Sequence, residues 1–439
     1  MKKPFFSNVF VNKQSLLTLC SSFFYFDISF AIWVILGAVG TFIADELKLT
    51  PVEKGIMVAI PIISGSSLRI ALGIAELGYG GKKTALIAMG VSFIPLVWGF
   101  VFAHTLKEIY LIGILLGVAG ASFAVAIPMA SRWFLPQHQG LVLGLTGSGN
   151  SGTLLSTLFG PMIAHRYGWH SVFGFFFLLL FIVFLFVFFF AEDAPRPQNE
   201  RITKESICRV LCQKKTWLLS LLYSLSFGGF IGFSSYLGFF LVDEYGVEKV
   251  NAGGLQTLLI ASGSLLRPLG GAIADKLGGM KVLILLFSLG SFFAFLPSFY
   301  FPLLLELTPI FFMMGCLGLA NGAIFQLVGT QAASHIGLTT GIVGAAGGIG
   351  GFLLPIFLGK IKESFGSCSF GFRLFSLFFL ICGIISIVSL SEGKRPFPPY
   401  PFLESPHKSK KFLFFPFLTF GSKETFGSKE EEEIEKRKK

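Results

Sequence analysis

The chain has 439 residues, of which 53% are hydrophobic and 13% charged, and its mean hydropathy is +0.75. Apolar runs long enough to cross a bilayer as helices recur along it, which excludes a soluble globular protein, and because these runs are continuous rather than alternating, they also exclude a transmembrane β-barrel. The formal net charge of +11 reflects basic loops beside membrane spans and gives no support to nucleic-acid binding.

The apolar runs predict an all-α membrane protein with twelve transmembrane helices. In chain order the predicted spans cover residues 16–43, 53–75, 84–103, 107–131, 139–164, 169–191, 216–241, 251–274, 279–300, 302–331, 336–361 and 370–391. A polar segment divides them six and six. The predicted parts are therefore a cytoplasmic N-terminus 1–15, an N-terminal six-helix bundle 16–191, a cytoplasmic linker 192–215, a C-terminal six-helix bundle 216–391 and a cytoplasmic tail 392–439. The tail is rich in Pro, Phe and Lys and then strongly charged, so we expect it to be disordered.

Basic residues set the expected orientation. If the N-terminus is cytoplasmic, the inner segments before the tail hold fourteen Lys and Arg residues and the outer loops hold eight. Loops rich in Lys and Arg stay on the cytoplasmic side of a membrane. We therefore expect a multi-pass protein of the cell (inner) membrane, embedded in the lipid bilayer with both termini in the cytoplasm.

Two arginines lie deep in apolar runs, and each ends nearly the same six-residue sequence motif. Arg69 ends the segment 64–69 (SGSSLR), and Arg267 ends the segment 262–267 (SGSLLR), 198 residues later. A charged side chain at bilayer depth costs roughly 2.5–3.5 kcal/mol, so it is rarely accidental. Because guanidinium is a planar fork that stays charged, the two halves of a duplicated chain are predicted to form one anion clamp. The alternative is that each arginine reaches the membrane surface or pairs with a nearby acid.

Two further features repeat between the halves. The turn after span two contains Glu76, and the turn after span eight contains Asp275 and Lys276. Spans five and eleven are both rich in glycine, which permits close helix packing, exposes backbone and allows a helix to slide. The glycines expected to pack or to gate are Gly147, Gly149, Gly152, Gly344, Gly347 and Gly348. Six-helix repeats with a site at their interface are typical of one large transporter architecture.

Over residues 15–391 these features resemble the major facilitator superfamily and, within it, the nitrate/nitrite porter family. The turn at Asp275 and Lys276 is similar to the superfamily's cytoplasmic loop motif, whereas in the first half Leu77 stands in the acid's place and Glu76 lies one position early. The more specific similarity is carried by five glycine-rich or aromatic segments, at 120–123, 144–152, 217–234, 321–326 and 341–351. The resemblance implies the major facilitator fold and a secondary transporter of nitrate, and probable nitrite transport is part of that expectation; no enzymatic activity is implied.

The resemblance also implies a substrate site. Nitrate is small, planar and weakly basic, so a protein holds it with fixed positive charge and in-plane donors rather than by proton transfer. In the family pattern Phe123 and Phe227 sandwich the planar anion, and Tyr223 donates its hydroxyl. Asn150 is a further possible donor. Flat aromatic faces exclude tetrahedral anions by shape, and their positive ring edges favour the anion slightly.

Asp27 is the acid that we place deep in the first span. Nitrate entry against an inside-negative potential costs about 2.3 kcal/mol per 100 mV, so uptake needs either co-transported protons or exchange for an internal anion such as nitrite. The segment 26–30 (FDISF) is similar to family members assigned to proton symport. We therefore expect Asp27 to respond to protons. The alternative is a buried acid hydrogen-bonded to its own span or paired with an arginine.

Several functions remain open at this point. The chain is expected to import nitrate with protons, but it could exchange nitrate for nitrite, carry another small anion such as an organophosphate or a carboxylate, or act as a nitrate sensor through its linker and tail. No cofactor is expected, and no metal, because the six cysteines and six histidines show no metal-binding spacing. The expected partners are nitrate, nitrite, protons and the bilayer, with the protein as a monomer.

Overall fold

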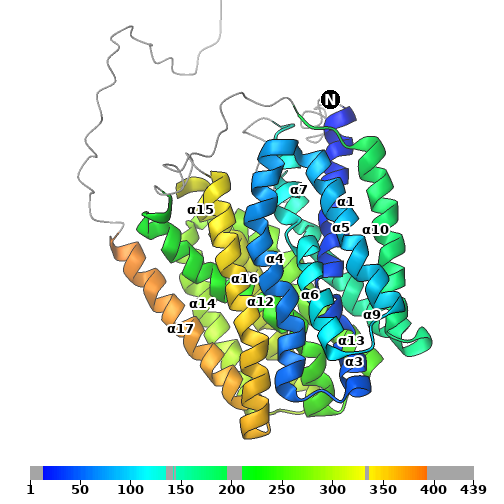
Figure 1. Cartoon of the computed structure of the whole chain (residues 1–439). Coiled ribbons are helices and arrows are strands. Elements are labelled where there is room, and N and C mark those ends of the chain that lie inside the picture. The colour runs from blue at the N-terminus through cyan, green and yellow to red at the C-terminus, as the bar shows by residue number, and fades with distance from the viewer. Residues whose placement is uncertain (1–12, 135–141, 143–144, 195–209, 332–335, 393–439) are drawn as a thin grey trace, which may run out of the picture. The chain divides into compact units, whose positions relative to one another are not determined.

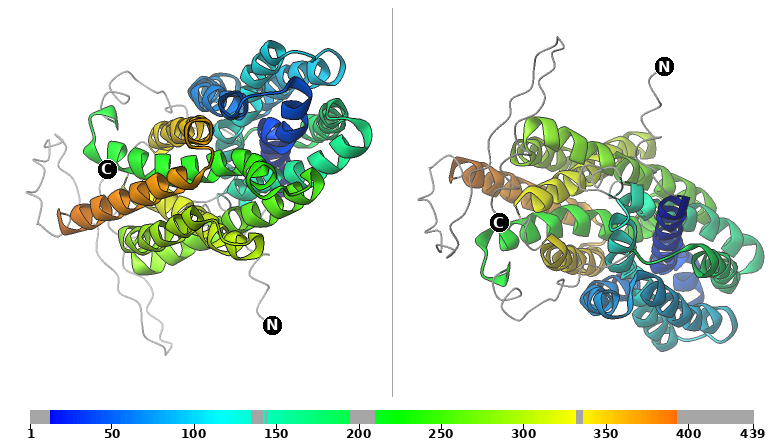
Figure 2. Two further views of the ribbon diagram at one scale, coloured as in Figure 1. Left: turned by 90° about the horizontal axis from the view of Figure 1, so that it is seen from below. Right: turned by 90° about the horizontal axis from the view of Figure 1, so that it is seen from above.

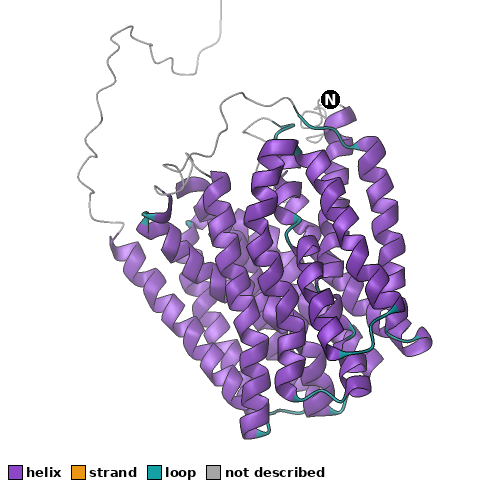
Figure 3. Ribbon diagram, in the orientation of Figure 1, coloured by secondary structure: helices purple, strands orange, loops and turns teal. Residues whose placement is uncertain are grey.

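The computed structural model describes residues 13–134, 142, 145–194, 210–331 and 336–392 (Figure 1). Within these ranges the regular structure is helical and contains no strand (Figure 3), so the predicted all-α class is confirmed. The described residues form one compact unit. The predicted tail lies outside them, as do most of the N-terminal segment and most of the linker.

The helices fall into two series, one on each side of the linker. The first series is α1 (Lys13–Trp33), α2 (Ile35–Ala38), α3 (Gly40–Leu47), α4 (Pro51–Tyr79), α5 (Gly81–Val101), α6 (Leu106–Gly120), α7 (Phe123–Ser131), the 3-10 segment η3 (Ser148–Ser151), α9 (Gly152–Tyr167) and α10 (His170–Phe190). The second series is α12 (Lys214–Tyr245), α13 (Lys249–Leu277), α14 (Gly279–Phe295), the 3-10 segment η4 (Leu296–Phe299), α15 (Leu303–Gln331), α16 (Ile336–Phe365) and α17 (Ser369–Glu392).

Among the described residues, 11 helical stretches are long and apolar enough to cross a bilayer. They correspond to all of the predicted spans except the fifth, 139–164. There the helix α9 has 16 residues and follows η3, while part of the stretch before η3 lies outside the described residues. The order of predicted spans is thus reproduced along the chain.

The first and fourth predicted spans are interrupted helices. The first divides into α1, α2 and α3 at Val34 and Val39, where ψ is 9° and 5°. The fourth divides between α6 and α7, where Ala124 N donates to Ala121 O instead of to Gly120 O. Because of the break, the Gly120 carbonyl does not accept the usual helical hydrogen bond from the backbone four residues later. It is therefore available to accept one from a side chain.

The sequence repeat is also a structural repeat, with a constant shift of 198 residues. The helices α4 and α13 begin at positions 51 and 249 and end at positions 79 and 277. The turns that follow them place Gly80 and Gly278 at φ 102° and 89°, a region that glycine adopts without strain. Lys48 and Gly246 are likewise both left-handed, at φ 53° and 64°. The equivalence of the halves therefore extends to single turns.

The two halves meet along two equivalent helix pairs, α4 with α16 and α9 with α13 (Figures 1 and 2). Each pair has a glycine at a close approach. A Cβ atom on Gly55 would lie 2.5 Å from Pro355 O, and one on Gly253 would lie 2.8 Å from Thr157 O. Gly55 and Gly253 are related by the same shift of 198. The helices approach this closely because these positions carry no side chain.

Ion pairs also join the halves, at the end of the bundle that carries α3 and is lowest in Figure 1. Lys54 Nζ lies 2.7 Å from Asp243 Oδ2, and Lys249 pairs with Asp45. Asp45 and Asp243 are equivalent positions in the two halves. The pairing is reciprocal, because each half supplies one acid and one lysine to the other. We call this end of the bundle the α3 end.

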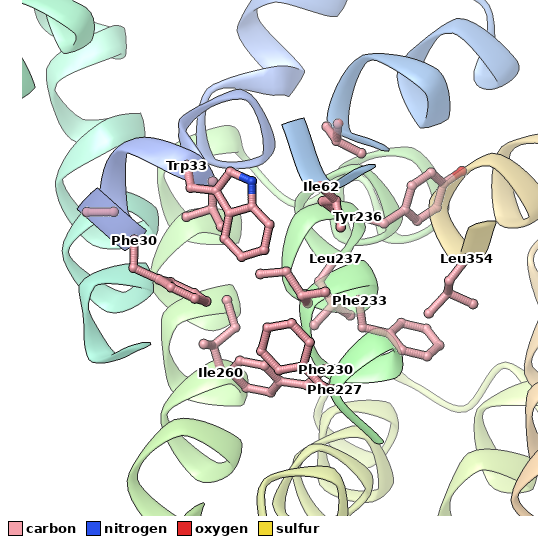
Figure 4. Close-up of a cluster of buried hydrophobic side chains, with 14 of the residues drawn as sticks. Phe30, Trp33, Ile62, Phe227, Phe230, Phe233, Tyr236, Leu237, Ile260 and Leu354 are labelled. Carbon is pink, nitrogen blue, oxygen red and sulfur yellow. The ribbon is translucent and has the colours of Figure 1, made fainter. Parts of the chain in front are cut away.

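The helix α12 forms the middle of the core. In its apolar stretch 94% of the residues are buried, and Phe227, Phe230 and Phe233 pack among side chains from helices of both halves, including Trp33 and Ile62 (Figure 4). A helix at the edge of a membrane bundle faces lipid on one side, whereas α12 is enclosed by other helices on nearly all sides. This position places α12 at the centre of the bundle, packed mainly against helices of its own half and also in contact with α2, α3 and α4 of the first half.

The close approach of α9 and α13 predicts different effects for two adjacent glycines. Replacing Gly253→Ala places a methyl group against Thr157 O and the Pro161 ring, so the helices must separate, at a cost of about 1–3 kcal/mol. Replacing Gly254→Ala meets no atom within 4 Å and improves helix propensity. We expect a lower Tm for the first variant in detergent solution and an equal or higher Tm for the second. Equal Tm values for both variants would contradict the contact.

Candidate functional site

The structure brings the two predicted arginines to the interface between the halves. Arg69 on α4 is 5% exposed and Arg267 on α13 is 8% exposed. Both lie near one ring, with Cζ 6.0 Å (Arg69) and 5.9 Å (Arg267) from the centroid of Phe123. Among the described residues neither guanidinium forms an ion pair with a carboxylate. Two buried cations without a counter-charge are unfavourable, so this arrangement favours the binding of an anion.

Arg69 is held by groups from both halves. Its Nη1 donates to Gly344 O of α16 at 2.9 Å, and its Nε donates to Gly120 O at 3.4 Å, the carbonyl released by the break between α6 and α7. The rings of Trp33 and Phe227 each lie 5.3 Å from its Cζ, within the range of cation–π contact. These contacts fix the position of the guanidinium in the space between α1, α4, α12 and α16.

Arg267 is held less firmly. Its Nη2 donates to the Tyr223 hydroxyl over a long distance of 3.5 Å, and its Cζ lies 5.4 Å from the ring centroid of Phe325. A guanidinium has five N–H donors. Within the described part of the chain Arg267 uses one of them, so most of its donors are available for a ligand.

The predicted aromatic residues surround the arginines. Tyr223 and Phe227, one turn apart on α12, are stacked with centroids 5.1 Å apart and an interplanar angle of 6°. Phe325 on α15 meets Tyr223 edge-on at 5.1 Å and lies 5.9 Å from Phe123. The site therefore combines two cations with flat aromatic surfaces and one hydroxyl, which suits a small anion with a planar shape.

Two residues of this site, Phe325 and Trp33, were not singled out from the sequence. The chain contains 54 Phe, so an aromatic residue in an apolar run carries no signal by its type alone. For Phe325 a signal did exist, because it lies in the segment 321–326 that resembles the family. For Trp33 the relevant observation is tertiary, namely its contacts with Arg69 and with the helices that support Arg69.

The predicted glycines of span eleven line this site. A Cβ on Gly347 would lie 2.5 Å from the Tyr223 ring, and a Cβ on Gly348 would lie 1.4 Å from Ser66 Oγ. Both positions therefore require glycine for the present packing. At Gly344 a Cβ would lie 3.5 Å from Arg69 Nη1, an ordinary contact, so the carbonyl rather than the missing side chain is the functional group there.

The predicted glycines of span five pack around α1. A Cβ on Gly149 would lie 2.6 Å from the Phe26 ring, and a Cβ on Gly152 would lie 1.8 Å from Asp27 O. At Gly147 a Cβ would meet no atom within 4 Å. Close packing therefore explains Gly149 and Gly152 but gives no reason for glycine at position 147.

Asn150, between these glycines, is 1% exposed. With its amide nitrogen oriented toward acceptors, Nδ2 lies 3.3 Å from Ser264 Oγ and 3.2 Å from Gly147 O. Ser264 precedes Arg267 by about one helical turn. Asn150 thus links η3 to α13 beside the second arginine, and no contact with a guanidinium is found for it among the described residues.

Asp27 lies outside the aromatic site, in the contact between α1 and span five. It is 8% exposed and accepts a hydrogen bond from Ser151 Oγ at 2.8 Å and another from the backbone of Gly152. Its partners therefore belong to span five, rather than to its own span or to an arginine. In the described ranges no group of three or more His, Cys, Asp or Glu could hold a metal ion.

Glu76 was expected in the turn after span two, but the structure places it in the last turn of α4, because that helix continues to Tyr79; there it forms a buried ion pair within the first half. It is 1% exposed, and both of its carboxylate oxygens face Arg132, which follows α7; the contact between Arg132 Nη2 and Glu76 Oε2 measures 3.0 Å. A bidentate pair of this geometry is strong and directional. Glu76 therefore fixes the end of α4 to the end of α7.

The equivalent segment of the second half, at the end of α13, is arranged differently. Asp275 and Lys276 are exposed at the end of α13. Glu76 corresponds to Ala274, which is fully buried, and Leu77 corresponds to Asp275. Since one residue turns a helix by about 100°, the shift of one position moves the acid from the exposed face to the buried face.

Comparison with known proteins gives a consistent result. A sequence model of the family described as "Major Facilitator Superfamily" matches residues 21–355. The "Nitrite extrusion protein" of Bacillus subtilis (strain 168) is 31% identical over 351 residues, which cover 79% of this chain and 87% of that protein. The "Probable nitrate transporter NarT" of Staphylococcus epidermidis is 30% identical over 366 residues, covering 83% and 94%. The "Probable nitrate/nitrite transporter NarK2" of Mycobacterium tuberculosis is 31% identical over 344 residues, covering 76% and 86%.

The buried pair of Glu76 and Arg132 predicts a strong effect of removing one charge. Arg132→Met leaves the Glu76 carboxylate buried with its main counter-charge removed, which we expect to destabilise the protein by roughly 3 kcal/mol. The double variant with Glu76→Leu removes both charges and should recover much of the loss. Thermal unfolding in detergent measures both effects. A double variant that loses as much stability as the two single variants together, or more, would contradict this account.

Proposed function

The chain belongs to the major facilitator superfamily and, within it, to the nitrate/nitrite porters, and from this premise we propose that it moves nitrate, and also nitrite, across the cell membrane by alternating access. A member of this family is a transporter rather than an enzyme. The proposed orientation places both termini in the cytoplasm of a monomer in the cell membrane, in keeping with the distribution of basic residues.

The observation that carries this proposal is the pair of buried guanidinium groups on either side of the interface. Arg69 comes from the first half and Arg267 from the second, and their Cζ atoms lie 6.0 Å (Arg69) and 5.9 Å (Arg267) from the centroid of the same ring, that of Phe123. An anion bound there contacts both halves at once. Binding therefore reduces the repulsion between the two cations and gives both halves a common ligand, which is the requirement for a substrate that couples their movement.

The aromatic surfaces support nitrate over tetrahedral anions. The ring of Phe227 lies over Arg69 and that of Phe123 lies near both arginines. A planar anion fits parallel to such rings while its three oxygens accept in-plane hydrogen bonds from guanidinium. Sulfate and phosphate project an oxygen out of the plane toward a ring face, where the quadrupole is negative. Their exclusion is thus steric and electrostatic.

The contacts between the halves support alternating access. Four contacts between the halves lie between the arginines and the α3 end. They are the ion pairs of Lys54 and Lys249 and the close approaches at Gly55 and Gly253. In the proposed orientation this end faces outward. The conformation would then be closed to the outside, with the substrate site serving the cytoplasmic side, and these contacts would break when the outer side opens.

We further propose that Asp27 couples transport to protons. Its carboxylate is buried between α1 and span five, and its partners Ser151 and Gly152 belong to the glycine-rich segment that also carries Asn150. A proton on Asp27 would weaken the hydrogen bonds it accepts and loosen α1 from span five. Because Asn150 reaches Ser264 on α13, beside Arg267, this change has a short route to the anion site.

Nitrate uptake into proteoliposomes tests the proposal. One set of vesicles carries an inward proton gradient and no internal anion, and the other carries internal nitrite and no gradient. Uptake under the gradient indicates symport, and uptake only into nitrite-loaded vesicles indicates exchange, the alternative mechanism. If neither set of vesicles takes up nitrate, binding to the protein is measured in competition with organophosphates and carboxylates. Tighter binding of one of these anions than of nitrate would assign the site to that anion. Binding without any transport would favour a sensor.

The anion clamp predicts a large effect of a change that keeps the charge. Arg267→Lys retains a cation but loses the planar fork that binds two oxygens of one anion. We expect nitrate uptake to fall at least about tenfold, equivalent to ~1.4 kcal/mol. Arg373→Lys, at an exposed arginine on α17, is the matched control and should transport like the unmodified protein. Uptake by Arg267→Lys within twofold of that control would rule out a bidentate role.

The proton-coupling proposal predicts a separation of two activities. Asp27→Asn keeps the shape of the side chain and the hydrogen bond with Ser151 but cannot change its charge. Gradient-driven nitrate accumulation should be lost, while exchange between internal and external nitrate is retained. Ser151→Ala, which removes one partner and leaves the carboxylate, should retain a gradient response. If Asp27→Asn accumulates nitrate under the gradient as before, Asp27 is not the coupling residue.

A further inference from the structure

Trp33, the last residue of α1, occupies the space behind Arg69. It is 1% exposed, and its Nε1 donates to Pro61 O at 2.6 Å. Pro61 lies on α4, about two turns before Arg69. The indole therefore ties the end of α1 to the helix that carries the first arginine, and Figure 4 shows its ring directed toward the core beside Ile62.

The indole also fills a gap that two glycines create. A Cβ on Gly65 would lie 2.7 Å from Trp33 Nε1, and a Cβ on Gly120 would lie 2.3 Å from its ring. Gly65 is on α4 and Gly120 ends α6. The carbonyl of Gly120 is the group that accepts the Nε–H of Arg69. Trp33 thus packs against both the helix of the arginine and the residue whose carbonyl holds it.

The ring face of Trp33 contacts the guanidinium directly. Its centroid lies 5.3 Å from Arg69 Cζ, a distance at which the ring quadrupole attracts a cation, more strongly in a desolvated site. On its other side Trp33 meets Phe30 edge-on at 5.1 Å, so the ring has little freedom to turn. One side chain therefore donates a hydrogen bond to the helix of Arg69, packs against two glycines beside it and makes a cation–π contact with the guanidinium.

Among its described residues the second half has no such brace. The position equivalent to Trp33 is Ile231, which has neither a ring nor a donor, and Arg267 is held by the long contact to Tyr223 and by its ring neighbours. The two arginines are equivalent in sequence but differ in how firmly they are fixed. The difference comes from the residues around them, namely Trp33 and the carbonyls of Gly120 and Gly344 beside Arg69.

We propose that Trp33 is a positioning residue that makes Arg69 the fixed arm of the anion site, while Arg267 is the adjustable arm. This inference rests on the proposed binding of nitrate between the two arginines. A fixed arm lowers the ordering cost of binding, since the guanidinium is already in place before the anion arrives. An adjustable arm can follow the anion when the second half moves.

The test compares nitrate transport kinetics and thermal stability of four variants in proteoliposomes and in detergent. Trp33→Phe keeps a ring and loses the hydrogen bond to Pro61; Trp33→Leu loses both. Phe173→Leu controls for lost packing, because it removes a buried ring on α10 that meets another tryptophan, Trp169, edge-on at 6.0 Å and has no contact with Trp33 or Arg69 among the described residues. Trp217→Phe is the matched tryptophan control, because Trp217 is 57% exposed and its Nε1 also donates to a carbonyl, that of Leu211, at 2.8 Å.

We expect the KM for nitrate to rise about three- to tenfold in Trp33→Phe and further in Trp33→Leu, with Vmax within about twofold. Trp217→Phe should change neither quantity, and Phe173→Leu should lower the Tm at an unchanged KM. An unchanged KM in both Trp33 variants, or the same rise in Phe173→Leu as in Trp33→Phe, overturns the positioning role. Absence of nitrate transport by the unmodified protein would instead refute the proposed function.

Discussion

Two buried arginines without a carboxylate partner are the constraint on which the rest of the described structure depends. The membrane interior penalises each charge, and their proximity adds mutual repulsion. The chain compensates with carbonyl dipoles, a hydroxyl and aromatic faces, supplied by a break between α6 and α7, by α16 and by α12. These groups are weaker than a carboxylate. The remaining deficit is what an anion would satisfy, and the placement of one arginine in each half makes that anion a contact between them.

The repeat of 198 residues accounts for the helical scaffold, whereas the residues around the arginines differ between the two halves. The shift of 198 residues relates helix ends, left-handed turns and the glycines at which the halves meet. Around the arginines the equivalence fails, because Trp33 corresponds to Ile231 and Asn150 corresponds to Gly348. Asp27 likewise corresponds to Leu225, so the buried acid of α1 has no counterpart in α12. In the proposed mechanism a symmetric frame permits the two halves to rock, and the unequal side chains allow the proposed ligand and proton to act differently on each half.

Glycine has two distinct roles in these helices. At Gly347 and Gly348 the missing side chain admits Tyr223 and Ser66, and at Gly152 it admits the backbone of α1. At Gly344 there is room for a methyl group, and the functional atom is the carbonyl oxygen that accepts from Arg69. Composition alone treats all of them as packing glycines. The distinction depends on what faces each Cα atom across the helix interface.

By itself the sequence determined the all-α membrane class, the order of the spans, the repeat and the two arginines, because hydropathy, span length and a charge in an apolar run are local properties. Resemblance to the family added Phe123, Tyr223 and Phe227, which the structure places around the arginines. Only the tertiary structure decided that Trp33 and Phe325 join them, that Ser151 and Gly152 are the partners of Asp27, and that Glu76 turns inward to Arg132. Those outcomes depend on helix breaks, on rotation about a helix axis and on contacts between residues far apart in the chain, and none of these is encoded in the local pattern.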